Sequence, residues 1–351
     1  MTNLVKLYRS RVSLSSQFLL LTIKVYGFYV TKQYTIYASK QKLSGVILKT
    51  FSFLLLLFLL ISQNAIANLS VTEVSPGIFV HFGKHQLPNT KNHGAVANIG
   101  FIVGESCVAV IDTGGNPNQG FALKKAIEKT TKTPICYVIN THVHPDHIYG
   151  NIAFKQPGVK FIGHEKLARA MSARGQFYND RSEDLLGVKL TAKHLIPPDQ
   201  SVKKQMTIDL GGRKLVLTAH PTAHTDNDLT VLDKKTNTLW MSDLLFLEHI
   251  PVIDGSLKGW LNELKRMEKI SYKYVVPGHG PLVTDWPKSL QAEKSYLQLL
   301  LTDIRKMIKK GQFLEQAVTE VGYSEKDKWK LFNQFHKMNV TTSFAALEWE
   351  D

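Results

Sequence analysis

Short apolar runs and amphipathic stretches alternate along this chain from residue 77 to its end. Most of the apolar runs are rich in Val, Ile and Leu and end at a turn-forming or polar residue, which is typical of buried strands. The stretch 256–270 instead repeats its apolar residues on one helical face. We therefore predict strands at 77–82, 97–103, 107–111, 135–139, 160–163, 205–210, 213–219, 229–232, 238–241 and 274–276, and helices around 121–127, at 165–174, 256–270, 286–310 and 326–349. The alternation indicates an α/β fold.

The first 67 residues differ in composition from the rest. They contain eight Lys or Arg residues and no Asp or Glu, and an apolar run at 51–61 precedes Asn64-Ala65-Ile66-Ala67, which has the small-residue spacing of a signal cleavage site. We predict cleavage after Ala67, which leaves one mature domain, 68–351, with a helical extension at 286–351. Residues 1–45 are long for a leader, so the start codon is better placed later in the gene. Without cleavage, 46–61 would act as a membrane anchor.

The leader also explains most of the positive charge. Removing its eight basic residues lowers the formal net charge of the chain from +14 to +6. The remaining Lys and Arg residues form no concentrated stripe, which argues against nucleic acid as a partner. A small-molecule substrate is the better expectation, with membrane contact only through an uncleaved anchor.

The chain has two cysteines, Cys107 and Cys136, and both lie in apolar, strand-like runs. Export would permit a disulfide, but a buried cysteine commonly behaves as a small apolar residue. We therefore expect two free thiols. Their number and spacing exclude a zinc site built from cysteines.

The candidate chemistry begins where the predicted strand 135–139 ends. His142 and His144 are two residues apart, so on an extended segment they point to the same side and can bind one metal ion. Asp146 and His147 lie just beyond the bend and can reach a second position nearby. This many polar groups at a strand end would carry a desolvation cost with no apolar gain, so a metal site explains them better than packing does.

Three residues at predicted strand ends or in turns can complete this site: His224, Asp243 and His279. Imidazole nitrogens combined with carboxylate oxygens favour zinc. Asp112 and His220 allow both a structural and a functional interpretation, because Asp112 can orient a ligating imidazole and His220 can do the same or contact a substrate. Of the other histidines, we expect pocket positions for His93 and His249 and no metal binding by His81, His164, His194 and His336.

The order and spacing of these residues resemble the metallo-β-lactamase superfamily over residues 74–282. The pattern runs through His142-x-His144-x-Asp146-His147, His224, Asp243 and His279. More narrowly, the segments 138–147, 220–228 and 347–350 are similar to those of the quinoprotein relay system zinc metallohydrolases. These are exported proteins associated with periplasmic quinoprotein dehydrogenase systems.

The resemblance implies an αββα sandwich with two zinc ions per chain at one edge of the paired sheets. It implies that the first ion is held by His142, His144 and His224, the second by Asp146, His147 and His279, and that Asp243 bridges them. A hydroxide between two such ions would attack an ester, thioester, lactone or amide, while Asp146 orients it. An aspartate at the position of Asp243 resembles glyoxalase II and related esterases and lactonases. True lactamases usually have cysteine or serine at this position. Ser242 replaces a glycine that is common before this aspartate.

Two alternatives remain open at this point: a non-catalytic zinc-bearing accessory protein, and a β-lactamase-type amide hydrolase. The resemblance also implies a periplasmic or secreted location and an association with a quinoprotein dehydrogenase system. We expect the substrate pocket to be lined by the loops 84–93, 176–186 and 247–256. Their polar residues indicate a polar pocket that tolerates anions, and these residues are His85, His93, Tyr178, Arg181 and His249.

Overall fold

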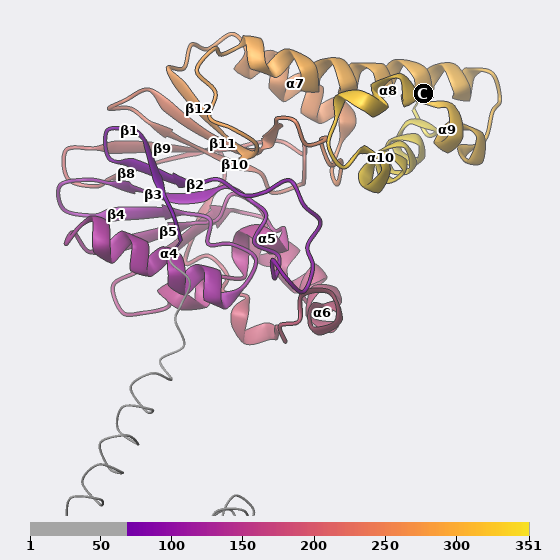
Figure 1. The fold of residues 1–351 in the computed structure, drawn as a ribbon. Helices are drawn as coiled ribbons and strands as arrows, with labels where there is room; N and C mark the ends of the chain where they lie inside the picture. Colours follow the sequence, from indigo (N-terminus) through magenta and orange to yellow (C-terminus); the bar gives the residue numbers. More distant parts are fainter. Residues whose placement is uncertain (1–68, 351) are drawn as a thin grey trace, which may run out of the picture. The chain divides into compact units, whose positions relative to one another are not determined.

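Two β-sheets pack face to face in the middle of the fold, and helices cover both outer faces (Figure 1). The structure is a computed structural model that describes residues 69–350, so the predicted leader lies outside the described residues. The first sheet has seven strands in sequence order: β1 (Thr72–Ser75), β2 (Ile78–His81), β3 (Ile99–Val103), β4 (Val108–Ile111), β5 (Ile135–Ile139), β6 (Lys160–His164) and β7 (Gln200–Val202). The second has the order β12 (Tyr274–His279), β11 (Thr238–Phe246), β10 (Leu229–Asp233), β9 (Lys214–Ala219) and β8 (Gln205–Asp209).

Helices form the two outer layers and a C-terminal extension. The α-helices are α4 (Pro117–Thr130), α5 (Pro145–Ile148), α6 (Leu167–Leu186), α7 (Leu257–Met267), α8 (Gln291–Lys309), α9 (Leu314–Glu320) and α10 (Phe332–Leu347), and the 3-10 helices are η1 (Asn151–Phe154), η2 (Ala192–His194), η3 (Lys288–Leu290) and η4 (Tyr323–Lys328). Helix α4 covers the first sheet, and α7 and α8 cover the second (Figure 1). No helix within residues 69–350 is both long and apolar enough to cross a membrane.

Burial explains why the strands appear in the sequence as short apolar runs. All four residues of β4 and all nine of β11 are buried, because each strand lies between the opposite sheet and a helical layer. Between the sheets, Ile78 and Ile102 of the first belong to the same core as Leu217 and Trp240 of the second. The predicted αββα sandwich with additional C-terminal helices is confirmed.

Several boundaries differ from the prediction. Helix α6 does not end before Gly175 but continues to Leu186, so residues 176–186 are helical rather than a loop. Gly175 has a packing role, since a Cβ atom there would lie 2.4 Å from a methyl carbon of Leu195. The sequence does not predict β1, β7 or α9, because short segments with few apolar residues carry no periodic signal.

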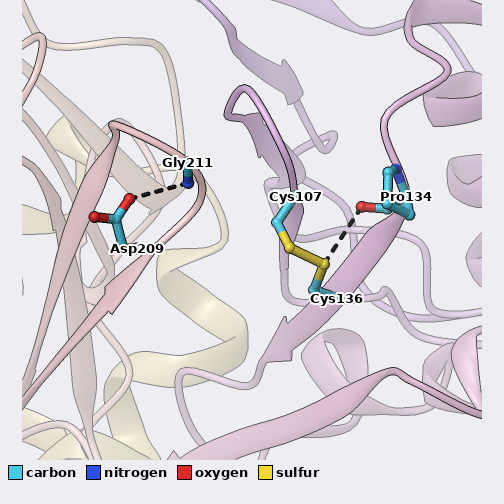
Figure 2. Close-up of a disulfide and its surroundings, with 5 residues drawn as sticks. All are labelled: Cys107, Pro134, Cys136, Asp209 and Gly211. Carbon is cyan, nitrogen blue, oxygen red and sulfur yellow. Dashed lines mark hydrogen bonds between the residues drawn. A yellow bond between two sulfur atoms is a disulfide. The ribbon is translucent and has the colours of Figure 1, made fainter.

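Cys107 and Cys136 form a disulfide, which corrects the expectation of two free thiols (Figure 2). The two residues lie at the starts of the neighbouring parallel strands β4 and β5, with their Cα atoms 5.6 Å apart. Both are only partly buried, so the argument that buried cysteines stay free does not apply. This bond joins the sheet at the end opposite to the one where β4 and β5 finish.

Replacing both cysteines with alanine is expected to lower the free energy of unfolding by about 3 kcal/mol, because the disulfide closes a loop between residues 29 apart in the unfolded chain. Urea denaturation of the variant, and of the parent protein with and without reductant, measures this difference. If the midpoints coincide, the disulfide does not contribute to stability.

Candidate metal centre

The predicted metal-binding residues gather at one edge of the two sheets. Strands β4 and β5 are parallel, and so are β11 and β12, so the carboxyl ends of each pair lie together. His142 and His144 follow β5, while Asp146 and His147 lie on the short helix α5 that starts at Pro145. The loop between β9 and β10 brings His224 to the same edge.

Asp243 lies inside β11 rather than after the strand predicted at 238–241. β11 continues to Phe246, but its pairing with β12 shifts register on both sides of Ser242. Ser242 has φ +50, a conformation that favours glycine, and its hydroxyl shares a 2.8 Å hydrogen bond with the hydroxyl of Thr141. In this irregular segment the side chain of Asp243 points toward the histidines that follow β5. His279, at the end of β12, also lies beside Asp243.

Four residues form the first group of candidate ligands: His142, His144, His224 and Asp243. The Nδ1 atom of His144 lies 3.1 Å from Nε2 of His142 and 3.0 Å from Nε2 of His224. Oδ2 of Asp243 lies 3.6 Å from Nε2 of His142 and 3.5 Å from Nε2 of His224. Three imidazole nitrogens and one carboxylate oxygen therefore face a common point.

Asp146, His147 and His279 form the second group. Oδ2 of Asp146 lies 3.4 Å from Nε2 of His279 and 3.7 Å from Nε2 of His147. Asp243 also faces this group, since its Oδ1 lies 3.2 Å from Nε2 of His147 and its Oδ2 lies 3.5 Å from Nε2 of His279. We call these seven residues the ligand cluster. Asp243 is the member that both groups share.

Two buried atoms of the ligand cluster show that it fits metal ions. Nε2 of His147 and Oδ1 of Asp243 are buried and, although they lie 3.2 Å apart, neither makes a hydrogen bond with the other or with another group in residues 69–350. Such atoms are costly in a protein interior unless another group satisfies them. Coordination to a cation would satisfy both, and imidazole and carboxylate ligands suit a transition-metal ion.

The charges within the ligand cluster also suit a cation. Burial lowers the pKa of His224 to about 3 and the pKa of His142 well below its usual value, so both rings are neutral and can coordinate. Burial alone would raise the pKa of Asp243, but the neighbouring His147 and His279 hold it well below its usual range. Burial alone would likewise lower the pKa of His147, but three carboxylates, that of Asp243 foremost, raise it. A cation would take the place of the proton on His147.

Hydrogen bonds to the second ring nitrogen fix the orientation of four of these histidines. Nδ1 of His147 lies 2.8 Å from Oδ2 of Asp112, which is fully buried and also accepts hydrogen bonds from the backbone and hydroxyl of Thr141. Asp112 therefore occupies the position suggested for it beside a ligand-cluster imidazole. The other three contacts are Thr141 Oγ1 with His142 Nδ1, Asp254 Oδ2 with His144 Nε2, and the Val252 carbonyl with His224 Nδ1.

His220 does not take part in this arrangement. Its Nδ1 lies 2.8 Å from Oε2 of Glu263 and its Nε2 lies 2.9 Å from the hydroxyl of Thr230. Both ring nitrogens are thus used inside the second sheet and its helix α7, and the ring does not line the cavity described below. The ring of His220 therefore connects β10 to α7 and contacts no residue of the ligand cluster through its nitrogens.

Asp254 and Arg174 are functional candidates that the sequence pattern does not reveal. Oδ2 of Asp254 contacts both Nε2 of His144 and the guanidinium of Arg174 on α6. Burial alone would raise the pKa of Asp254, but the hydrogen bonds and positive charge of His144 and Arg174 lower it. The carboxylate of Asp254 therefore stays ionised. A single aspartate in a loop and a single arginine on a helix carry no local sequence signal. Their partners are distant along the chain, since Asp254 is 110 residues from His144 and 80 residues from Arg174.

The C-terminal extension supports the loop between β11 and α7, which carries Val252 and Asp254. The side chain of Asn339 on α10 is fully buried, donates to the carbonyl of Pro251 at 2.6 Å and accepts from the backbone amide of Ile253 at 2.9 Å. This loop supplies the Val252 carbonyl and the Asp254 carboxylate that orient two histidines. Helix α10 therefore helps to position the ligand cluster.

Replacing Asn339 with alanine is expected to weaken metal binding by about tenfold, the lower end of what loss of an outer-sphere partner costs. Metal affinity can be measured by competition with a chromophoric chelator. Asn333→Ala, which changes an exposed asparagine of the same helix, is the matched control. Equal affinities of the two variants would show that α10 does not position the loop.

A cavity of about 440 Å³ opens beside the ligand cluster, and five of the seven residues line it, all except His142 and His147. His249, Tyr178 and Arg181 also line it, as expected, whereas His85 and His93 do not. The rest of the lining is mostly apolar, which corrects the expectation of a polar pocket. Burial lowers the pKa of His249 to about 3, so this ring is a neutral part of the wall.

The histidines for which we predict no metal binding lie outside both groups. Each makes a hydrogen bond elsewhere: His81 with the Ser70 carbonyl, His164 with the Lys166 amide, His194 with Thr191, and His336 with Tyr296 and the Val321 carbonyl. Within residues 69–350, the histidines that belong to a group able to hold a metal ion are therefore those of the ligand cluster.

Comparison with known families agrees with this geometry. The family model of the metallo-beta-lactamase superfamily matches residues 94–279, which include the whole ligand cluster and end at His279. The chain belongs to this superfamily, whose members are generally hydrolases, and it is a metallo-hydrolase with His and Asp groups able to bind metal ions.

Three proteins are similar to this chain at 25% sequence identity or less. A protein of Streptococcus pyogenes serotype M6 described as a probable metallo-hydrolase is 25% identical over 207 residues, which cover 56% of this chain and 84% of that protein. A metallo-beta-lactamase from Pontibacter korlensis is 22% identical with a TM-score of 0.53, covering 65% of this chain and 98% of that one. A metallo-beta-lactamase from Hirschia baltica is 19% identical with a TM-score of 0.52, covering 66% and 98%. These two structures have the same fold.

Proposed function

We propose that this protein is an exported, dinuclear zinc hydrolase that cleaves an ester, thioester, lactone or amide. The observation that carries the proposal is the shared carboxylate of Asp243, which lies within 3.6 Å of an imidazole nitrogen in each of the two ligand groups. A buried carboxylate between two sets of histidines suits two cations close together. Imidazole and carboxylate ligands favour zinc as the metal.

The residues have separate roles in this proposal. His142, His144 and His224 would hold one zinc ion, Asp146, His147 and His279 the other, and Asp243 both. When bound, the two ions would supply a hydroxide nucleophile at neutral pH and a Lewis acid for the substrate carbonyl.

Asp146 is the residue best placed to handle the proton. Its side chain is 18% exposed and lines the cavity, whereas the side chain of Asp243 is 4% exposed. Asp146 can therefore hydrogen-bond a water molecule on the cavity side, orient it and accept its proton. The apolar walls of the cavity exclude other water from the reacting carbonyl.

The relatives leave the bond type open. The streptococcal relative is described only as a probable metallo-hydrolase, and the two structural neighbours are called metallo-beta-lactamases. Asp243 supports an ester, thioester or lactone rather than a β-lactam, because the true lactamases of the superfamily usually have cysteine or serine at this position. β-Lactam hydrolysis is the second candidate, supported by the shared fold.

We also propose that the protein is periplasmic or secreted and works beside a quinoprotein dehydrogenase system. The basic, then apolar, leader that ends at Ala67 supports export. The Cys107–Cys136 disulfide supports it too, because disulfides persist in oxidising compartments. Sequencing the N-terminus of the mature protein tests the cleavage site and should find Asn68.

The enzymatic proposal is tested by metal analysis together with a hydrolytic screen. We expect about two zinc ions per chain and activity on at least one thioester, ester or lactone. Asp146→Asn should lower that activity by about 10²-fold or more, since loss of a general base costs this much. Asp327→Asn, at an exposed position on η4, should not. A zinc-loaded protein without activity on any of these substrates or on β-lactams would instead be an accessory protein.

A further inference from the structure

The cavity beside the ligand cluster has a chemical character of its own. Its volume, about 440 Å³, lies in the range of small-molecule pockets. Away from the ligand cluster, its walls come from the segment 86–96, from α6 and from α10. The side chains that matter here are Leu87, Val96, Phe177, Leu185, Leu186 and Phe335. A ligand that fills this space must be largely apolar to recover the free energy of burial.

The apolar wall continues to the surface. Leu87, Phe177 and Leu185 line the cavity, yet they are 41%, 56% and 50% exposed. Residues 69–350 contain only five other large hydrophobic side chains that are exposed, so three of eight meet at one cavity. Exposed apolar groups gathered around a concavity mark a binding site for an apolar ligand.

Arg181 adds a positive charge to this mouth. It lies one helical turn after Phe177 on α6, and its guanidinium carbon is 4.5 Å from the centre of the Phe177 ring. In the described part of the chain Arg181 makes no ion pair, whereas Arg174 on the same helix is paired with Asp254. The aromatic ring holds the guanidinium in place without neutralising it. An anionic group can therefore bind beside it.

We propose that this cavity binds an amphiphilic anion, with the apolar chain or ring of the ligand along α6 and its anionic group beside Arg181. That the ligand is the substrate rests on the proposed function, because the far end of the cavity is the ligand cluster. The binding itself depends only on the walls. The substrate would then be an ester, thioester or lactone with a sizeable apolar portion and a negative charge.

Binding of straight-chain alkanoates and alkanols to the purified protein tests this proposal. Displacement of the dye anilinonaphthalene sulfonate gives the affinity of each compound from four to twelve carbons. We expect the affinity to rise about fourfold per added methylene until the cavity is full, the factor that corresponds to about 0.8 kcal/mol per buried CH₂.

Variants identify the site. Phe177→Ser and Leu185→Ser should each weaken binding of the longest chains by about tenfold, since each removes several apolar carbons. Phe121→Ser is the matched control, because Phe121 is 41% exposed on α4 and does not line the cavity. Arg181→Gln should weaken binding of alkanoates by about fivefold, as for an exposed charge pair, and leave alkanols unchanged.

The results separate this proposal from the hydrolase proposal. Affinity that does not depend on chain length, or that is the same in the Phe177, Leu185 and Phe121 variants, overturns the assignment of the cavity even if the protein hydrolyses esters. Chain-length-dependent binding that Phe177→Ser and Leu185→Ser weaken, and that Phe121→Ser leaves unchanged, supports the assignment even if every ester is left intact. If Arg181→Gln weakened the binding of alkanols and alkanoates equally, the assignment of the ligand's anionic group to Arg181 would be wrong.

Discussion

Replacement of Asp243 by asparagine is expected to reduce hydrolytic activity by more than about 100-fold and to reduce the metal content from about two ions per chain to one or none. Loss of an outer-sphere partner already costs up to about 100-fold in affinity or activity, and Asp243 would contact both ions directly. Asparagine has nearly the same shape, so the fold should persist, but its amide is neutral and can no longer balance two cations next to His147.

Metal analysis, activity and a denaturation curve should be measured on the same sample of Asp243→Asn. Asp327→Asn is again the control, because Asp327 is exposed and lies outside the ligand cluster. A variant that is folded, retains two ions and keeps its activity would exclude a bridging role for Asp243. A variant that loses both ions and remains folded would show that bound metal is not required for the fold.

Most of the ligand cluster could be predicted because its residues carry local signals. His142 to His147 are dense polar residues at the end of an apolar run. His224 stands in a loop and His279 at a strand end, whereas Asp243 lies inside β11 and not at the strand end that the sequence predicts. The αββα packing then explains why segments so far apart meet, since parallel strands deliver their carboxyl ends to one edge.

The supporting residues could not be predicted in the same way. Asp254 and Asn339 are isolated polar residues whose partners are distant in sequence, and nothing local distinguishes them from solvated side chains. The disulfide depends on the parallel register of β4 and β5, which places Cys107 beside Cys136. Register is a property of the folded sheet, and it was not available from the two apolar runs alone.

The sequence predicts the wrong polarity for the pocket because it places the end of α6 too early. If α6 ended at residue 174, the polar residues of 176–186 would be free to turn toward the site. Because the helix continues, its period places residues 177, 181 and 185 on one face and 178, 182 and 186 beside them, and all six line the cavity. Four of these six are Phe, Tyr or Leu, so the helix presents a mainly apolar wall.

A buried ion pair between Arg213 and Asp233 lies at the opposite end of the sheets from the ligand cluster. The guanidinium of Arg213 is almost fully buried and forms two hydrogen bonds with Asp233, through Nε at 3.0 Å and Nη2 at 2.9 Å. Its third nitrogen donates to the carbonyl of Val103 in the first sheet. Gly77 has φ +72, and a Cβ atom there would lie 2.4 Å from this guanidinium. Arg213 thus links the two sheets through a charge that is almost fully buried.

Replacing Arg213 with methionine is expected to lower the free energy of unfolding by about 3–5 kcal/mol, because it leaves the carboxylate of Asp233 buried without its partner. Adding Asp233→Leu should recover most of this loss, since apolar replacement of a whole buried pair is often neutral. Arg305→Met breaks an exposed pair with Glu350 and should cost at most about 1 kcal/mol. Urea denaturation compares these three variants with the parent protein. The zinc concentration is kept the same throughout, because bound metal would otherwise shift the midpoints. If Arg213→Met is no more costly than Arg305→Met, the two sheets are held together by their apolar core alone. If the double variant is the least stable, Asp233 stabilises the fold through its hydrogen bonds to Lys235 and Thr236 rather than through Arg213.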